Sequence, residues 1–381
     1  MHIGINATYQ LRGGGLSHLR RLLSEWSSED VRKGHRFTIF TRKDNVPLIE
    51  DVAGEWARVR VVDSWRFSVA AKLIWEQVVF PSVLRRTRVD VVYCPGGIVP
   101  LFAAIPSVVL FQNMGPLCPS VKRSSVGMFY AVWFAAVGQM MARSARRAAR
   151  CVTVSYHARE EISRHFGVPE SLCDVIYHGR DGAHNDVTIS RDRALSGRYA
   201  LCVSHLHPHK GIRELILAVD LAKEAFRRRG LRLAIVGEPR GAAHHRELLA
   251  LIRKRRLDDV VELVGGLPHD AIRDALSGCE FFVFQSTCES FGLPLLEALE
   301  AKAPICSSRA SVMPEIAGEA ALYFDPADPA SIAESLTKMA EDGALRERLR
   351  GATGAEVAKF PTWREVAEMT VDSLEKGAGA A

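Results

Sequence analysis

The stretch Glu280–Glu300, EFFVFQSTCESFGLPLLEALE, joins a short apolar strand to a helix through a turn that carries a glutamate and a glycine. A strand that is apolar on both faces is typical of a buried parallel sheet. Gly292, just before the helix, lets the backbone and a ligand approach each other closely. The first-turn amides of a helix lack intrahelical partners and lie at the positive end of its dipole. We therefore expect an anionic group, such as a diphosphate, in front of this helix.

Short strands and amphipathic helices alternate twice along the chain. The strands are rich in Val and Ile and apolar on both faces, which predicts parallel strands with helical crossovers. The expected fold class is therefore α/β, with two successive doubly wound domains. The expected strands are His2–Asn6, Arg36–Phe40, Val59–Val62, Val89–Cys94, Ser107–Phe111, Cys151–Ser155, Asp174–His178, Tyr199–Ser204, Leu231–Gly237, Val260–Gly265, Glu280–Gln285, Pro304–Ser307 and Ala321–Phe324. The helices expected in the second half are Ile212–Arg228, His245–Arg255, Asp270–Leu276, Leu293–Ala301 and Pro329–Glu341.

A polar stretch with little periodicity, 179–198, separates the two alternating regions, and we interpret it as a linker. A chain of 381 residues is also too long for one typical core. The expected domains are 1–185 and 186–360, followed by a final helix within 361–381.

Composition restricts the partners and the compartment. The net charge of +6 suits an anionic small molecule or an anionic membrane surface, and no dense basic run with interleaved aromatic residues indicates nucleic acid. Eight cysteines are scattered without a CxxC pair, so we expect buried free thiols in a reducing compartment. The N-terminus, MHIGINATYQ, enters a strand directly and lacks a secretory signal pattern, which favours the cytoplasm.

One apolar segment raises the question of membrane contact. Val126–Ala142 has no charge and runs into four arginines that we place on one helical face. Three interpretations stay open: a buried or domain-edge helix with a solvated basic end, a helix lying on the anionic inner leaflet, and a span at the lower limit of length. The four arginines are Arg143, Arg146, Arg147 and Arg150.

Two glutamates of the opening stretch are candidate sugar ligands. Glu289 precedes the helix and Glu297 lies eight residues further along. Ionised carboxylates accept hydrogen bonds only, and sugar hydroxyls donate them. The separation fits one contact with a transferred sugar and one with a ribose on the other side of the phosphates.

The string Glu289-Ser-Phe-Gly-Leu-Pro-Leu-Leu-Glu297 resembles the Glu-x7-Glu motif of retaining glycosyltransferases of family 4, glycosyl transferases group 1 with the GT-B fold. The resemblance covers nearly the whole chain and includes SHLHPHKG (Ser204–Gly211), SVMPEIAGEAALYFDP (Ser311–Pro326) and FPTW (Phe360–Trp363). It implies two Rossmann-like domains facing a central cleft, with the helix in 361–381 returning to the first domain. It also implies transfer of a hexose, of mannose or rhamnose type, from a nucleotide-diphosphate sugar to a hydroxyl of a glycan or lipid-linked glycan in bacterial surface-polysaccharide synthesis.

The resemblance implies roles for individual residues. Glu289 would contact the donor sugar, and Lys210 and His205 would face the diphosphate. Residues expected to bind the donor are Glu297, Ser290, Phe291, Gly292, Leu293, Gly237, Gly14 and Gly15, the last two in a glycine loop before an expected helix over Leu16–Leu23. Residues expected on the acceptor side are Gln112 and Asn113.

Two positions depart from the family pattern. His205 stands where an arginine is usual, and Gln112 stands where many members have a histidine, so a general-base role for that position does not transfer. The donor phosphate would instead take the acceptor proton on the same face. The sequence has neither the Asp-x-Asp triplet of metal-dependent glycosyltransferases nor recognisable metal-ligand spacing, so we expect no metal and no cofactor.

Two other function classes remain open from sequence. A nucleotide-sugar 2-epimerase of the same fold would consume donor without an acceptor. A non-catalytic sugar-nucleotide-binding subunit would not turn over the donor, either with or without an acceptor. The two departures from the family pattern motivate this interpretation.

Overall fold

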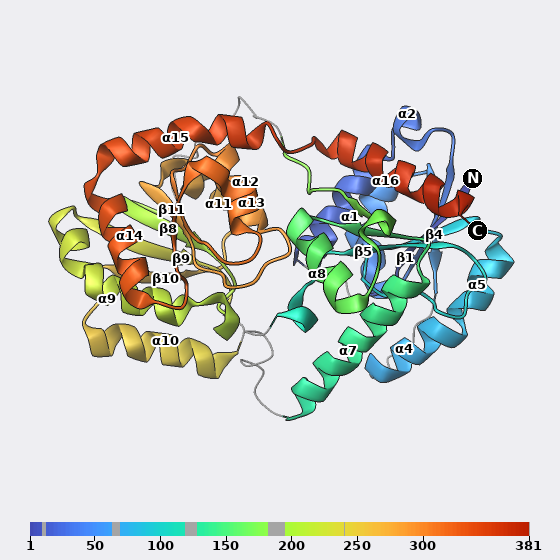
Figure 1. Ribbon diagram of the computed structural model, residues 1–381, viewed down its shortest axis with the longest axis horizontal. Helices are drawn as coiled ribbons and strands as arrows, with labels where there is room; N and C mark the ends of the chain where they lie inside the picture. Colours follow the sequence, from blue (N-terminus) through green and yellow to red (C-terminus); the bar gives the residue numbers. More distant parts are fainter. Residues whose placement is uncertain (10–12, 63–68, 119–127, 182–194, 240, 381) are drawn as a thin grey trace. The chain divides into compact units, whose positions relative to one another are not determined.

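The computed structural model describes residues 1–381 except 10–12, 63–68, 119–127, 182–194, 240 and 381; of residues 69–73, 128–131 and 209 it describes the backbone alone. The chain divides into two compact units. The first comprises Met1–Leu117, Gly127–Gly179 and Pro361–Ala381, and the second comprises Cys118–Val126 and Arg180–Phe360. Each unit contains one parallel sheet with helices on both of its faces (Figure 1).

The first unit is built on a seven-stranded sheet in the order β3-β2-β1-β4-β5-β6-β7, with every pair parallel. Its central strands are buried at every residue, because helices cover both faces. The strands are β1 His2–Ala7, β2 Arg36–Thr41, β3 Ala57–Val61, β4 Val91–Cys94, β5 Ser107–Phe111, β6 Arg150–Thr153 and β7 Cys173–Val175. The helices are α1 Gly13–Glu25, α2 Glu29–Arg32, α3 Glu50–Ala53, α4 Val69–Val78, α5 Phe80–Thr87, α7 Met128–Arg147, α8 Tyr156–Phe166 and α16 Trp363–Gly379.

The last helix, α16, packs on the first unit although it follows the whole second unit in sequence. It starts with a capping box, in which the Thr362 side chain accepts from the Glu365 amide and the Glu365 carboxylate accepts from the Thr362 amide. Near its other end Gly377 touches β5, where an added Cβ would lie 2.7 Å from Val108. The buried face of α16 is thereby fixed against the sheet.

The second unit is built on a six-stranded parallel sheet in the order β10-β9-β8-β11-β12-β13. Its core is a continuous cluster of aliphatic and aromatic side chains from the sheet, α9, α10 and α14. The strands are β8 Arg198–Val203, β9 Leu231–Val236, β10 Val261–Gly265, β11 Phe281–Phe284, β12 Ile305–Ser308 and β13 Ala321–Phe324. The helices are α9 Ile212–Arg228, α10 Ala242–Arg255, α11 His269–Gly278, α12 Leu293–Glu300, α13 Met313–Ala317, α14 Pro329–Glu341 and α15 Gly343–Val357.

The strand order reverses once in each sheet. In the first unit β1 lies between β2 and β4, and in the second β8 lies between β9 and β11. Ligands of doubly wound folds bind at the carboxyl ends of the strands on either side of such a switch point. The expected fold class, two Rossmann-like doubly wound sheets, is confirmed, and every expected strand is present.

The region proposed to meet the membrane differs from the expectation in one respect. Arg150 does not share a helical face with the other three arginines, because α7 ends at Arg147 and Arg150 begins β6. Its guanidinium pairs with Asp174 at 2.5 Å, while Arg146 donates to the Phe166 carbonyl and Arg147 to the Ala103 carbonyl. Three of the four side chains therefore bind protein atoms. Among the helices described, none is both long and apolar enough to cross a bilayer.

The expectation of eight free thiols is wrong for two cysteines. Cys118 and Cys288 form a disulfide, with Cα atoms 6.2 Å apart, although the two residues are 170 positions apart in sequence. The other six cysteines are free and buried. Sequence spacing cannot reveal a pair that only the fold brings together.

Candidate active site

The candidate site of the second unit lies where β11 leads into α12. β11 is fully buried and pairs with β8, where the strand order reverses, so its carboxyl end lies beside the switch point. Gly292 precedes α12 with a φ of +85°, a left-handed conformation that glycine adopts without strain. Ser290 and Leu293, on either side, are partly exposed. A helix N-terminus, which favours anions, therefore lies at this edge of the sheet.

Phe291 contributes its backbone to this turn, because its side chain is buried. The ring is 1% exposed and packs edge-on against Phe360, with centroids 5.7 Å apart. Replacing it would remove an aromatic contact that holds the turn in place. The donor contact expected of Phe291 would therefore come from its backbone, which the buried ring anchors.

The two strongest polar candidates meet directly. Lys210 Nζ lies 2.5 Å from Glu289 Oε1, and both side chains are about four-fifths buried, with exposures of 20% and 18%. Lys210 ends the short helix η4 (Pro208–Lys210), and Gly211 follows with a φ of +69°. An added Cβ at Gly211 would lie 2.8 Å from the Gln285 side chain, so only glycine lets this turn pack beside the carboxyl end of β11. Close backbone packing thus brings Lys210 to Glu289.

A residue that we did not assign from sequence fixes the backbone of Glu289. The Ser311 hydroxyl donates to the Glu289 carbonyl at 2.9 Å and accepts from its amide at 3.3 Å. Ser311 has a φ of +55°, unusual for a residue with a side chain. The sequence signal was its position at the start of the quoted stretch Ser311–Pro326, but no spacing rule links it to Glu289.

Glu297 lies in α12 among other acidic groups. Burial, followed by the charges of Asp181 and Glu300, raises the pKa of Glu297 from 4.5 to about 7, and Arg273 opposes this rise. His269 Nδ1 lies 3.9 Å from Glu297 Oε1, and the side chain is 26% exposed. Glu300 is itself engaged, because it accepts from the Asp181 amide at 2.7 Å. Glu297 is therefore a carboxyl group whose charge is disfavoured until a hydrogen-bond donor reaches it.

His205 and Gly237 lie at the ends of β8 and β9. A side chain at Gly237 would overlap the Ser204 carbonyl oxygen, so the two strand ends approach as only glycine permits. His205 is exposed, its carbonyl accepts from the His207 amide at 2.8 Å, and the His207 carbonyl accepts from the Lys210 amide at 2.9 Å. Two successive turns therefore connect His205 to Lys210.

In the first unit the glycine segment differs from the expectation. Gly13, Gly14 and Gly15 do not form a loop before a helix over Leu16–Leu23; they are the first turn of α1, which runs from Gly13 to Glu25. Gly13 has a φ of +53°, which glycine adopts without strain, and the first-turn amides of a helix have no intrahelical acceptors. The segment thus presents a helix N-terminus without side chains at the carboxyl end of β1.

The two residues expected on the acceptor side have different surroundings. Gln112 lies beside the glycine turn, where an added Cβ at Gly15 would be 3.3 Å from its Nε2, and it donates to the Pro95 carbonyl at 3.1 Å. Asn113 is exposed, and its side-chain oxygen accepts from the Gly115 amide at 2.9 Å, which closes a local turn. The structure brings Gln112, Gly14 and Gly15 together, whereas Asn113 stabilises its own loop.

A buried carboxyl group supports the same edge of the first sheet. Glu76 on α4 is 5% exposed, and its Oε1 accepts from Asn6 Nδ2 at 2.7 Å and from the Thr8 hydroxyl at 3.5 Å. Asn6 belongs to β1 and Thr8 follows it. The sequence signal was one acidic residue, followed by Gln77, in a segment, Leu73–Pro81, whose other residues are apolar.

Comparison with known proteins gives matches in both halves. Residues 12–183 match the family described as Glycosyltransferase Family 4, and residues 190–354 match the one described as Glycosyl transferases group 1. The chain is 26% identical over 231 residues to the O-antigen chain mannosyltransferase B of Escherichia coli, which is 59% of this chain and 60% of that protein.

A second relative comes from Campylobacter jejuni, the N-acetylgalactosamine-N,N'-diacetylbacillosaminyl-diphospho-undecaprenol 4-alpha-N-acetylgalactosaminyltransferase. It is 28% identical over 206 residues, 53% of each chain, so this chain matches only 53% to 60% of the length of these two relatives. Among solved structures, Anabaena HepE in complex with UDP has a TM-score of 0.74 over 98% of this chain and 100% of that chain, at 18% identity. At this identity the likeness demonstrates a shared fold.

Proposed function

Because the chain belongs to the glycosyltransferases of group 1 and family 4, we propose that it moves a hexose, with retention of configuration, from a nucleotide-diphosphate sugar to a hydroxyl of a glycan or lipid-linked glycan in surface-polysaccharide synthesis. The observation that carries this proposal is the pair Lys210–Glu289 at the carboxyl end of β11, beside the start of α12. A cation, a carboxylate and a helix N-terminus at one sheet edge match the phosphates and hydroxyls of such a donor.

The pair must separate when the donor binds. The diphosphate competes with Glu289 for Lys210, because it carries more negative charge than one carboxylate. Glu289, once released, accepts hydrogen bonds from hydroxyls of the sugar, while the amides at the start of α12 face the phosphate. The ion pair of the free protein keeps both side chains compensated in a partly buried position, so neither remains as a lone buried charge.

Glu297 is assigned to the ribose. Its raised pKa indicates a carboxyl group that lacks strong donors in the free protein, and the two ribose hydroxyls would supply them. Binding would then lower the pKa of Glu297 and release a proton near neutral pH. Because this contact exists in the ground state and the transition state alike, it contributes to donor affinity more than to turnover.

The proposed reaction uses no protein nucleophile. The leaving phosphate would accept the proton of the acceptor hydroxyl, while Lys210, His205 and the start of α12 stabilise its charge without a metal. Gln112 and the first turn of α1 are assigned to the acceptor side of the first unit. We propose mannose as the transferred sugar, because the E. coli relative is named a mannosyltransferase.

The acceptor is proposed to be anchored in the membrane. The C. jejuni relative is named for an acceptor linked to diphospho-undecaprenol, a lipid. An enzyme that uses nucleotide sugars on such an acceptor would work peripherally at the cytoplasmic face of the inner membrane.

Donor turnover with and without acceptor tests the proposal. Purified protein is incubated with GDP-mannose, with other nucleotide sugars and with lipid-linked or soluble glycan acceptors, and the products are separated by chromatography. We expect nucleoside diphosphate to be released in proportion to elongated acceptor. Isomerisation of the donor without acceptor would identify an epimerase, and binding without turnover would identify a non-catalytic subunit.

A further inference from the structure

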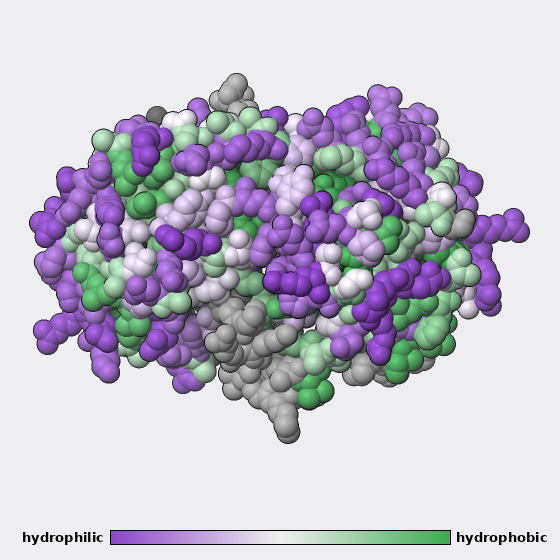
Figure 2. Space-filling view, viewed as in Figure 1, coloured by the Kyte–Doolittle hydropathy of each residue, from purple (hydrophilic) through white to green (hydrophobic). Residues whose placement is uncertain are grey.

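An exposed apolar surface of the first unit is not used by the proposed site. It consists of α4, α5 and the loop 99–105, and we call it the α4–α5 surface. Phe102 is 76% exposed, Ile74 64% and Val78 63%, and Val79 adds a fourth exposed side chain. These four are among only ten exposed large hydrophobic side chains in the described part of the chain. Figure 2 shows hydrophobic side chains gathered over the region of α4 and α5.

The loop that carries Phe102 is held firmly. Gln77, on α4, donates to the Val99 carbonyl at 3.0 Å and accepts from the Leu101 amide at 2.7 Å. From α7, Ser144 accepts from the Val99 amide at 3.1 Å and Arg147 donates to the Ala103 carbonyl at 3.0 Å. Four hydrogen bonds on both sides of Phe102 therefore hold an aromatic ring in water, an unfavourable arrangement unless something covers it.

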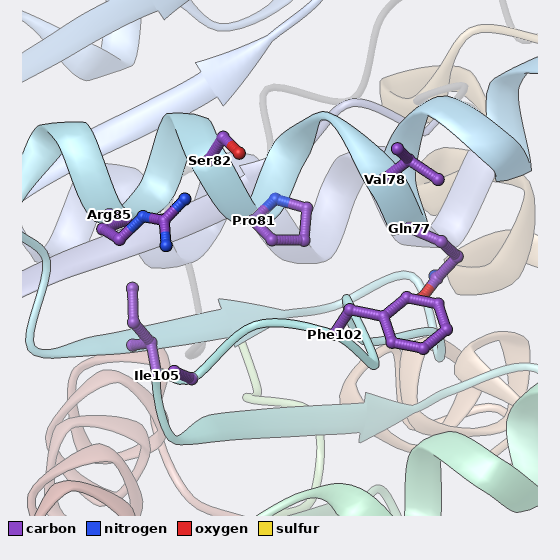
Figure 3. A pocket seen from close by; sticks show the side chains of 8 residues that line it. Gln77, Val78, Pro81, Ser82, Arg85, Phe102 and Ile105 are labelled. Atoms are coloured by element: carbon purple, nitrogen blue, oxygen red, sulfur yellow. The ribbon is translucent and has the colours of Figure 1, made fainter.

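A cavity of about 330 Å³ lies within this surface. Figure 3 shows Arg85 and Ile105 at one end, Gln77 and Phe102 at the other, and Pro81 and Ser82 of α5 between them. The walls are mostly apolar, and the one charged group is the Arg85 guanidinium. The cavity can take an apolar group at one end and an anionic group at the other.

The charges on this surface are of one sign. Arg85 and Arg86 are exposed, and neither guanidinium has an ion-pair partner among the residues that the structure describes. Glu76, the acidic residue of α4, is buried and bonded to Asn6. The stretch 95–106, PGGIVPLFAAIP, contains no charged residue. These elements therefore present apolar side chains beside arginines and carry no exposed carboxylate. Such a surface complements a lipid leaflet, in which anionic headgroups lie above hydrocarbon.

We propose that the α4–α5 surface docks the protein onto an anionic lipid bilayer, with Phe102 and Val78 entering the interface and Arg85 and Arg86 facing lipid phosphates. The proposal deepens the proposed function and rests on its lipid-anchored acceptor, because docking would bring the enzyme to the surface in which that acceptor lies. It differs from the interpretation based on Val126–Ala142, since the arginines that end α7 bind mostly to protein atoms.

Vesicle flotation of the full chain without donor or acceptor tests the proposal. The vesicles are phosphatidylcholine alone or phosphatidylcholine with about one third phosphatidylglycerol, at low and high salt. We expect binding to the anionic vesicles only, weakened by salt. Each arginine near an anionic surface contributes about 1 kcal/mol, or about fivefold, so Arg85→Gln with Arg86→Gln should weaken binding about 25-fold. Phe102→Ala should weaken it about tenfold, through loss of buried apolar area.

Matched controls lie on the second unit. Leu221→Ala removes a side chain that is also 64% exposed, and Arg253→Gln with Arg348→Gln removes two other exposed arginines. These controls should bind like the wild type, and all variants should retain its melting temperature and its affinity for nucleoside diphosphate. Because flotation needs no turnover, a failed transfer assay with intact docking would contradict the proposed function alone.

Three results would overturn the proposal. The first is absence of binding to anionic vesicles. The second is loss of binding in Val132→Ser on α7, with wild-type binding in Phe102→Ala. The third is a self-association in sedimentation velocity that Phe102→Ala abolishes, which would show that a second copy of the chain covers the surface.

Discussion

Replacing Glu297 by glutamine should stabilise the protein at alkaline pH and weaken donor binding. The carboxyl group has a pKa of about 7 in the folded chain and 4.5 without the fold. Below pH 4.5 the carboxyl group is protonated in both the folded and the unfolded state, so it does not lower the free energy of unfolding. Between about 4.5 and 7 the unfolded chain ionises more readily, so folding loses stability as pH rises, and above pH 7 the whole penalty is present.

The size of the penalty follows from the shift. One pKa unit corresponds to about 1.4 kcal/mol, so the rise at Glu297 corresponds to about 3 kcal/mol above pH 7. Glutamine keeps the shape without a charge. Glu297→Gln should therefore raise the free energy of unfolding by up to about 3 kcal/mol at pH 8, or the melting temperature by about 5 °C or more. The gain should vanish near pH 4.5.

Differential scanning fluorimetry of wild type and Glu297→Gln between pH 4.5 and 8.5 measures this difference. Glu334→Gln, which alters an exposed carboxylate 68% accessible on α14, is the control and should shift little at any pH. Donor affinity, measured by calorimetry, should fall in Glu297→Gln, because an amide is a weaker acceptor for ribose hydroxyls. A stability gain of equal size at pH 4.5 and 8, or no gain at pH 8, would refute the reasoning.

Four other predictions address the site. Glu289→Ala should lower kcat strongly while Glu297→Ala mainly raises the donor KM; steady-state kinetics that show equal effects on both parameters in both variants would contradict the roles. Turnover should survive EDTA, and loss that Mn²⁺ or Mg²⁺ restores would disprove metal independence. Donor affinity should weaken as pH rises and the histidine loses its charge, and the variant His205→Arg should remove that pH dependence while keeping activity. Identical Kd profiles for the wild type, His205→Arg and His205→Ala between about pH 6 and 9 would show that His205 is structural. Gly237→Ala should abolish donor binding by displacing the Ser204 backbone, and unchanged nucleotide binding in calorimetry would show that the strand ends relax.

The local sequence pattern was sufficient to predict most of the strands and helices. Ser107–Phe111, Ala321–Phe324, Ile212–Arg228 and Pro329–Glu341 were predicted with the bounds that the structure has. Each is a run whose periodicity and breakers act over a few residues, and buried parallel strands are apolar on both faces wherever they lie. The sequence alone also placed Gly292 between a buried strand and a helix, which is a local feature of one turn.

The local sequence pattern was insufficient to predict where a helix starts or ends when that position depends on contacts with other parts of the fold. The glycines of α1 look like a loop in sequence, since glycine is a poor helix former, but the first turn requires little from propensity. Arg150 looks like the continuation of an arginine face, but β6 begins there because its backbone pairs with β5 and its side chain with Asp174.

The sequence by itself determined the α/β class, two doubly wound sheets and the family motif around Glu289, because these depend on burial and turn chemistry within short segments. Only the tertiary structure decided that Lys210 meets Glu289 across 79 positions, that Ser311 holds the Glu289 backbone, and that Glu297 is desolvated enough for its pKa to reach about 7. Ion pairing and desolvation depend on distances between segments far apart in the chain, which no local pattern encodes.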